Sequence, residues 1–248
     1  MSLPRFYIPP SSWDLANLVL TGDEARHCAQ VMRRQVGDEI VVFNGGGARA
    51  RASITAIGKE RVELKLEDSG ETPPPVVGLS LLLAIPKGAN MDLIIEKAVE
   101  LGVNEILPVF SERTVVKLDA RDSAKKREKW ERIALEACKQ CGQNWLPKVH
   151  VPLPFDAVWS TLPSHDLRFV AAIQEDAVPF KTALADARAQ VYPPASALMV
   201  IGPEGDLTPA EYALARSQGC VPITLGAIIL RVETAAMYCL SVLTHELR

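Results

Sequence analysis

The residues best suited to chemistry form a glycine-bounded turn, Gly202–Gly205, which is followed at once by the start of a helix. Thr208 and Glu211 have the spacing of the two partners in a capping box, so the helix begins just after the turn. Two glycines this close together permit a tight turn or the close approach of a ligand to the backbone. Because Glu204 and Asp206 are acidic, they disfavour a phosphate group there. The turn predicts a site for an uncharged or cationic ligand.

A second unusual segment, Leu225–Ala235, follows the next predicted strand and runs into the last helix. Its apolar residues extend to Leu230, and Arg231, Glu233 and Thr234 come next. From the residues alone, two interpretations are open. The segment is either a buried connection with a local ion pair between Arg231 and Glu233, or the second wall of an apolar pocket shared with the turn.

The elements that position both segments alternate between apolar strand-like runs and helical patterns. Such alternation predicts a mostly parallel sheet with helices on both faces. Ligands bind such sheets beyond the carboxyl ends of the strands, which is where the glycine turn falls. The expected strands are 79–85, 105–110, 167–173, 197–201 and 221–225, and the expected helices are 91–101, 123–141, 209–217 and 232–246.

A proline run at Pro73–Pro75 separates this region from a smaller N-terminal module, because consecutive prolines favour a stiff, extended linker. The module carries short alternating strands, the hairpin signal Asn44–Gly47 and one helical stretch over residues 23–34. We therefore expect a small β-barrel with one helix over residues 1–71 and an α/β domain over residues 76–248. The expected strands of the barrel are 39–43, 50–57 and 61–66.

The composition is that of a globular protein: 248 residues, 48% hydrophobic and 23% charged, with a formal net charge of −3. No apolar run approaches the ~18 residues of a membrane span, and the N-terminus lacks the basic and apolar regions of a signal peptide. We therefore expect a cytoplasmic protein. Five scattered cysteines argue against a disulfide framework. Cys138 and Cys141 lack a second ligand pair, so we expect packing residues on a helix and no metal site.

Several motifs, in order along nearly the whole chain, resemble the RsmE family of bacterial ribosomal RNA methyltransferases in the SPOUT superfamily. The two segments described above carry the strongest likeness, as IGPEG…LTPAE and LG…ILR-x-ETA. The other matching stretches are Pro4–Tyr7, His27 with Val31–Arg33, Gly37–Asp38, Phe43–Gly45, Lys87–Gly88, Met91–Asp92, Ile95–Lys97, Glu100–Val103, Ser111–Thr114 and Glu136–Gly142.

The resemblance implies a PUA-like barrel followed by a SPOUT methyltransferase domain with a C-terminal trefoil knot. It implies a homodimer that transfers a methyl group from S-adenosyl-L-methionine to N3 of a uridine in the 16S rRNA of the small ribosomal subunit. Arg231 is the candidate for stabilising the uridine anion. The residues implied at the cofactor are Gln174, Glu175, Ile201, Gly202, Pro203, Glu204, Gly205, Leu225, Gly226, Leu230, Thr234 and Ala235. The candidates for the RNA surface are Arg5, Arg26, Arg33, Arg34, Lys87 and Arg113.

The chain departs from the family pattern at four positions. Asp206 replaces the last glycine of the Gly-Pro-Glu-Gly-Gly turn, Ala227–Ile228 replace Pro-Arg, and Gln143 replaces an arginine. A basic residue near the target base is therefore missing. The alternative hypotheses are a diverged or catalytically silent RNA-binding or assembly factor on the same fold, and a knotted enzyme that methylates a ribose or another base.

Overall fold

The computed structural model describes residues 3–116 and 118–248. The chain divides into two compact units. The first unit comprises the chain up to Pro74 together with Leu135–Leu146, and the second comprises Pro75–Ala134 and Pro147–Arg248. Helix α3 (Ala120–Cys141) begins in the second unit, and its last turns belong to the first.

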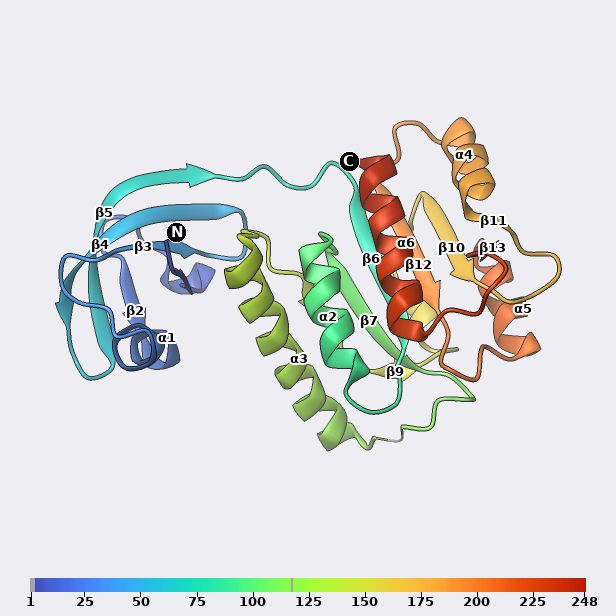
Figure 1. Cartoon of the computed structure of the whole chain (residues 1–248), viewed down its shortest axis with the longest axis horizontal. Coiled ribbons are helices and arrows are strands. Elements are labelled where there is room, and N and C mark those ends of the chain that lie inside the picture. The colour runs from blue at the N-terminus through green and yellow to red at the C-terminus, as the bar shows by residue number, and fades with distance from the viewer. Residues whose placement is uncertain (1–2, 117) are drawn as a thin grey trace. The chain divides into compact units, whose positions relative to one another are not determined.

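The first unit is built on a curled five-stranded sheet with the strand order β1-β3-β4-β5-β2 (Figure 1). Strand β1 pairs in parallel with β3, and the remaining pairs are antiparallel. Alternate residues of β4, among them Ala50, Ala52 and Ile54, point into the buried core of this unit. The strands are β1 (Arg5–Tyr7), β2 (Val19–Thr21), β3 (Glu39–Phe43), β4 (Ala48–Ile57) and β5 (Arg61–Glu71).

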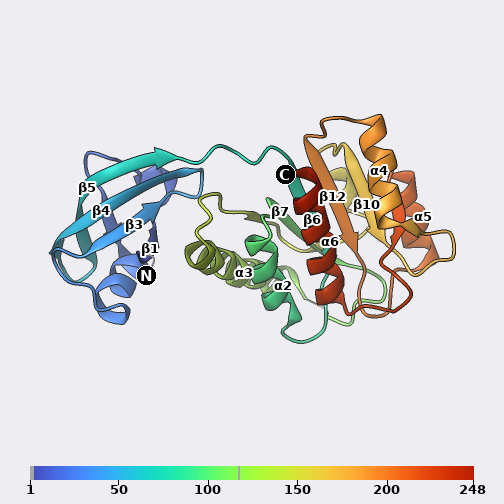
Figure 2. The ribbon, with the colours of Figure 1, turned by 45° about the horizontal axis from the view of Figure 1, so that its top comes forward.

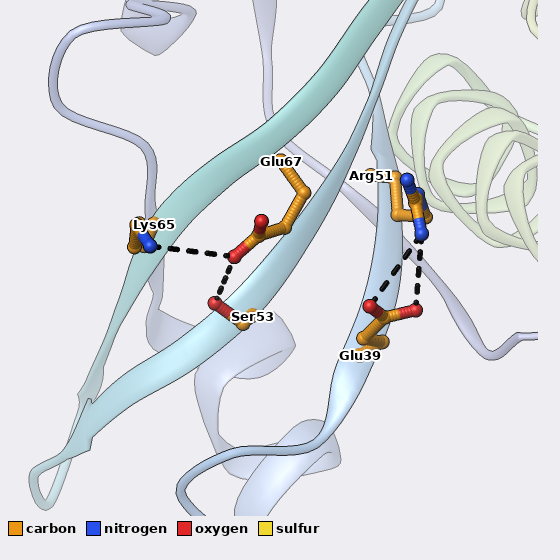
Figure 3. A network of polar contacts seen from close by, with 5 residues as sticks. All are labelled: Glu39, Arg51, Ser53, Lys65 and Glu67. Carbon is orange, nitrogen blue, oxygen red and sulfur yellow. Dashed lines mark hydrogen bonds and ion pairs between the residues drawn. The ribbon is translucent and has the colours of Figure 1, made fainter.

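The solvated face of this sheet carries polar contacts between strands and within β5 (Figure 3). Arg51 lies 3.4 Å from Glu39 on the neighbouring strand. The Ser53 hydroxyl donates to Glu67 at 2.7 Å, and Lys65 lies 3.9 Å from the same carboxylate. Exposed pairs of this kind contribute ~0–1 kcal/mol each to stability. Their main consequence is a polar outer face, since the apolar residues of the same strands point inward.

The end of α3 completes the first unit. The indole of Trp145 donates to the carbonyl oxygens of Thr72 and Pro73 at 3.0 and 3.1 Å. Lys139 is 8% exposed and forms ion pairs with Glu24 and Glu136, at 2.8 Å in the second case. A short helix α1 (Gly22–Arg26) and a π-helical turn at His27–Val31 occupy the predicted helical stretch over 23–34.

The second unit contains an eight-stranded sheet in which every pair is parallel. Its strand order is β11-β13-β10-β12-β6-β7-β8, with β9 also pairing to β7. The strands are β6 (Gly78–Ala84), β7 (Glu105–Phe110), β8 (Lys148–Val149), β9 (Leu153–Pro154), β10 (Leu167–Ala171), β11 (Val178–Pro179), β12 (Ser196–Ile201) and β13 (Val221–Thr224).

Helices cover both faces of the parallel sheet (Figures 1 and 2). Val170, Leu198 and Val200 point to one face, where they pack with Tyr212 of α5. The opposite face is covered by α2 and α6, which contact each other, and by α4, whose Phe180 lies 5.4 Å from the ring of Phe169. These helices are α2 (Asn90–Glu100), α4 (Phe180–Gln190), α5 (Pro209–Ser217) and α6 (Val232–Leu247).

Most predicted elements are confirmed, with ends that differ by a few residues. The strand at 105–110 and the helix at 209–217 have the predicted bounds, and α3 begins three residues before the predicted 123. Helix α4 and the short strands β1, β2, β8, β9 and β11 were not predicted. The buried residues of α4 are Phe180, Ala183 and Leu184, a face too narrow to produce a clear helical pattern.

The predicted capping box of α5 is present. The Thr208 hydroxyl accepts a hydrogen bond from the Glu211 N–H at 3.3 Å, and the Glu211 carboxylate accepts from the Thr208 N–H at 2.8 Å. The other carboxylate oxygen of Glu211 accepts from the Glu112 N–H at 2.8 Å. This side chain therefore fixes both the start of α5 and the segment after β7.

We predict that Thr208→Ala lowers the free energy of unfolding by about 1–2 kcal/mol, because it removes the cap and leaves a buried N–H of the first turn without a partner. Urea unfolding followed by circular dichroism measures the change. Thr182→Ala is the matched control, since Thr182 is exposed in the first turn of α4. Equal stability of the two variants would contradict this account of the cap.

Candidate functional site

The predicted glycine turn leaves the carboxyl end of β12 and is closed by a hydrogen bond from the Asp206 N–H to the Pro203 carbonyl at 2.9 Å. Gly202 allows the backbone to pack closely against Leu207, because a Cβ there would lie 3.1 Å from the Leu207 side chain. The left-handed position of the turn is taken by Asp206, with φ of 63°. Aspartate tolerates this conformation better than most residues with side chains. Asp206 thus replaces the glycine of the family pattern at a position whose left-handed backbone conformation favours glycine.

Two segments from elsewhere in the second unit hold the outer side of this turn. The Glu204 carboxylate accepts a hydrogen bond from the Lys87 N–H at 2.9 Å. The Arg113 guanidinium donates to the Gly205 carbonyl at 2.8 Å. Glu204 was expected at the cofactor and Arg113 at the RNA, and the structure gives both a direct part in fixing the turn.

Asp206 is fixed from the inner side. The Tyr212 hydroxyl, on α5, donates to the Asp206 carboxylate at 2.6 Å. Burial, reinforced by this hydrogen bond, raises the pKa of Tyr212, so its hydroxyl keeps its proton and remains the donor. Tyr212 is 2% exposed, which makes it a rigid support for the carboxylate.

The second segment leaves β13 at Thr224 and reaches α6 at Val232. Gly226 has φ of 124°, a conformation that is essentially restricted to glycine. Ile228 and Ile229 are 75% and 77% exposed. The backbone N–H groups of residues 227–230 donate to no other residue in the described part of the chain. They are therefore available to a ligand.

The two segments form opposite walls of one cleft at the carboxyl ends of β10, β12 and β13. It holds about 660 Å³ of space with its open mouth included, and most of the residues that line it are apolar, as is usual for small-molecule sites. The lining residues are Ala171, Ala172, Ile173, Ile201, Gly202, Pro203, Asp206, Thr224, Leu225, Gly226, Ala227, Ile228, Ile229, Leu230, Val232 and Ala235.

The structure brings many of the residues expected at the cofactor together in this cleft, and leaves others outside it. The expected residues that line it are Ile201, Gly202, Pro203, Leu225, Gly226, Leu230 and Ala235. The expected residues that do not are Gln174, Glu175, Glu204, Gly205 and Thr234. The third loop reaches the cleft through Ala171–Ile173 instead, while the Gln174 side chain accepts a hydrogen bond from Arg216 at 2.7 Å.

The residues missed by sequence reasoning adjoin those that were named. Ala171–Ile173 end a strand next to β12, and Ala227–Ile229 lie inside the second segment. The signal that could have found them was their position at or just after the carboxyl ends of the predicted parallel strands 167–173 and 221–225. For Asp206 and Thr224, position in the sequence was not enough, because the conformation of the loops decides whether they line the cleft.

Arg231, the candidate catalytic residue, is exposed at the N-cap of α6 and is not part of the cleft lining. Within the described residues it has no ion pair with Glu233, whose carboxylate instead accepts from the Asn90 amide at 3.3 Å. The interpretation of the segment as a local ion pair is therefore wrong. The Arg231 side chain is exposed between Leu230 and Val232, two residues that do line the cleft.

The basic residues expected at RNA are divided between the units. Arg26 and Arg33 are exposed in the first unit, and Arg34 lies 3.9 Å from Asp38. Arg5 is engaged internally, because its guanidinium donates to the Asn144 side chain and lies 4.9 Å from the centre of the Phe43 ring. Lys87 and Arg113 are exposed in the second unit.

Gln143 takes part in a local structure where the family pattern has an arginine. Its side-chain oxygen accepts hydrogen bonds from the N–H groups of Asn144 and Trp145 at 3.0 and 3.2 Å. This arrangement orders the chain directly after α3. Cys138 is buried and Cys141 exposed on that helix.

No cluster of three or more side chains suited to bind a metal occurs in the part of the chain that the structure describes. Within the same residues, every helix is too short or too polar to cross a membrane.

Two family models match the chain. An RNA methyltransferase domain matches residues 72–244, and an RNA methyltransferase PUA domain matches residues 20–67. Ribosomal RNA small subunit methyltransferase E from Bacillus subtilis is 33% identical over 229 residues, which cover 92% of this chain and 89% of the relative. The enzyme of the same name from Synechocystis is 31% identical over 96% of this chain and 76% of the relative.

Solved structures agree over almost the whole length. A putative methyltransferase from Legionella pneumophila, in complex with the cofactor SAM, has a TM-score of 0.87 at 29% identity. A ribosomal RNA small subunit methyltransferase E from Neisseria gonorrhoeae, bound to S-adenosyl methionine, has a TM-score of 0.85 at 29% identity. Each alignment covers 99% of this chain and 98% of the other.

These matches confirm the expected fold class, a PUA-like domain joined to a mostly parallel α/β methyltransferase domain. They also confirm the resemblance first seen in the two segments that now form the cleft walls. The chain belongs to the ribosomal RNA small subunit methyltransferase E family.

Proposed function

We propose that this protein uses S-adenosyl-L-methionine to methylate N3 of a uridine in the 16S rRNA of the small ribosomal subunit. The observation that carries the proposal is the cleft itself. It lies at the carboxyl ends of three adjacent parallel strands, in a chain whose relatives are named ribosomal RNA small subunit methyltransferase E. Two structural neighbours hold S-adenosylmethionine.

The chemistry of the cleft fits this cofactor. Adenine needs an apolar slot with backbone hydrogen bonds. The cleft offers apolar side chains beside the N–H groups of 227–230, which donate to no other residue that the structure describes. The cofactor supplies an electrophilic methyl group on a sulfonium cation. The Asp206 carboxylate in the lining is compatible with that charge.

The protein's own contribution to catalysis is mainly positioning. Methyl transfer is an in-line displacement, so holding the donor and the base in register lowers the barrier. Uridine N3 carries its proton at neutral pH and must lose it before or during attack. We assign to Arg231 the stabilisation of the negative charge that develops on the base, because its guanidinium is exposed beside the cleft segment and free of an ion pair within the described residues.

The target base must also be accessible. N3 lies on the Watson–Crick edge, so a paired uridine has to be unpaired and turned outward. We assign residues 1–71 to an RNA-binding barrel and residues 76–248 to the methyltransferase domain. Exposed cations of both supply phosphate contacts, which set affinity without reading sequence. Of the candidate residues, Arg26, Arg33, Lys87 and Arg113 are exposed and Arg34 is half-buried beside Asp38, while Arg5 orders the first unit.

The assembly is proposed to be a cytoplasmic homodimer with a knotted C-terminal segment, as the family resemblance implies. The adjacent residues Ile228 and Ile229 on the cleft loop, exposed to 75% and 77%, support a partner surface there. Large apolar side chains exposed together are commonly covered by an interaction partner.

The direct test uses labelled S-adenosylmethionine and small ribosomal subunits from a strain that lacks this activity. Nuclease digestion and mass spectrometry then locate the label. We predict label on uridine N3 of 16S rRNA, which would also show that Ala227 and Ile228 replace the family's Pro-Arg without loss of function. Cofactor binding with no label on the subunit would favour a catalytically silent RNA-binding factor.

We predict that Arg231→Ala lowers the rate of methyl transfer by about 10²–10³-fold, the usual effect of removing one group that stabilises developing charge. Cofactor affinity should change little, because Arg231 does not line the cleft. Arg231→Lys should recover part of the rate. Arg188→Ala, at an arginine paired with Glu246 on α6, is the control. A wild-type rate for Arg231→Ala would exclude this role.

Gly226→Ala should weaken S-adenosylmethionine binding by about tenfold or more, because a side chain at φ of 124° strains the loop into another shape. Isothermal titration calorimetry measures the dissociation constant. Gly219→Ala introduces similar strain at φ of 82° outside the cleft lining. That control should lose stability and keep its affinity. If both variants bind alike, the loop conformation is not what forms the site.

A further inference from the structure

The structure singles out one side chain in the cleft by its charge. Among the described residues that line the cleft, Asp206 is the one that carries a charged side chain. The residues around it are alanines, glycines, aliphatic side chains, one proline and one threonine. A charge in such surroundings is less screened than at an open surface.

The carboxylate is also held in place. Its backbone is fixed by the hydrogen bond to Pro203, and its side chain by the 2.6 Å hydrogen bond from Tyr212. The Tyr212 hydroxyl is neutral, so it orients the carboxylate without cancelling its charge. The nearest arginine of α5, Arg216, is engaged with Gln174 and Asp176 and pairs with neither oxygen of Asp206.

The backbone conformation of Asp206 is unfavourable for a residue with a side chain. Asp206 adopts the left-handed region that glycine occupies freely, and the family pattern has glycine at this point of the turn. A side chain at this position therefore adds a group to the cleft that glycine would not supply. The added group is a negatively charged side chain among the residues that line the cleft.

We propose that Asp206 is a specificity-determining residue that favours a positively charged donor in the cleft over its neutral product, an inference that rests on the proposed function. In the transfer step the bond between sulfur and the methyl carbon breaks, and its electron pair stays on sulfur. A bond forms between that carbon and uridine N3, whose proton leaves to a base or to water. The sulfur thereby loses its positive charge, while the adenosine, the ammonium and the carboxylate of the ligand remain unchanged.

A fixed carboxylate near the sulfur therefore attracts the donor more than the product. It stabilises the complex that is ready to react and favours release of S-adenosylhomocysteine afterwards. A carboxylate that faced the ammonium instead would attract both ligands equally, because both carry that group. The ratio of the two dissociation constants separates these arrangements.

The experiment measures the Kd of S-adenosylmethionine and of S-adenosylhomocysteine by isothermal titration calorimetry on the full chain. Asp206→Asn keeps the shape of the side chain and removes its charge. Asp206→Gly removes the side chain and suits the left-handed backbone, so it guards against misfolding of the turn. Asp186→Asn removes a charge from an exposed position on α4 and is the matched control.

We expect the preference for the charged donor, Kd of the product divided by Kd of the donor, to fall by about tenfold in both Asp206 variants, the effect of one lost charge interaction in a partly exposed site. Asp186→Asn should keep the wild-type ratio. Equal weakening of both ligands, or an unchanged ratio, would overturn the proposal while leaving the proposed function intact. Failure of the wild-type protein to bind S-adenosylmethionine would instead overturn the proposed function.

Discussion

The candidate site depends on a single turn that is fixed from both sides. On its outer side, Glu204 accepts a backbone hydrogen bond from Lys87 and the Gly205 carbonyl accepts one from Arg113. On its inner side, Asp206 accepts a hydrogen bond from Tyr212, which is buried in the core under the sheet. Since these groups come from distant parts of the domain, the turn can hold its shape only when the whole parallel sheet is assembled. A preorganised wall of this kind is what a positioning mechanism requires.

The opposite wall of the cleft, the segment after β13, differs from the turn in its backbone and in its exposure. The segment after β13 has unpaired backbone donors among the described residues, exposed isoleucines and a glycine at φ of 124°. A ligand that pairs with these N–H groups would therefore help to order the segment. The cleft thus combines a rigid wall, which carries the charge at Asp206, with a wall formed largely by backbone. Three of the departures from the family pattern, Asp206, Ala227 and Ile228, lie in the lining of this cleft.

The sequence was sufficient to predict the architecture and to name many of the residues that line the cleft. Alternating strands and helices predicted the parallel sheet, and the capping box predicted the start of α5, because both are recorded in local patterns. Helix α4 escaped because its buried face is narrow. The direction of each side chain in the turn could not be predicted. Glu204 and Asp206 are both acidic and two residues apart, yet one turns outward to Lys87 and the other lines the cleft, a choice made by partners distant in the sequence.

The most direct test of the central claim is a crystal structure of this protein grown with S-adenosylmethionine. The account predicts density for the ligand between the turn after β12 and the segment after β13, with the adenine against the backbone of residues 227–230 and the sulfur on the side of Asp206. Density for the ligand elsewhere, or a sulfur turned away from Asp206, would contradict it.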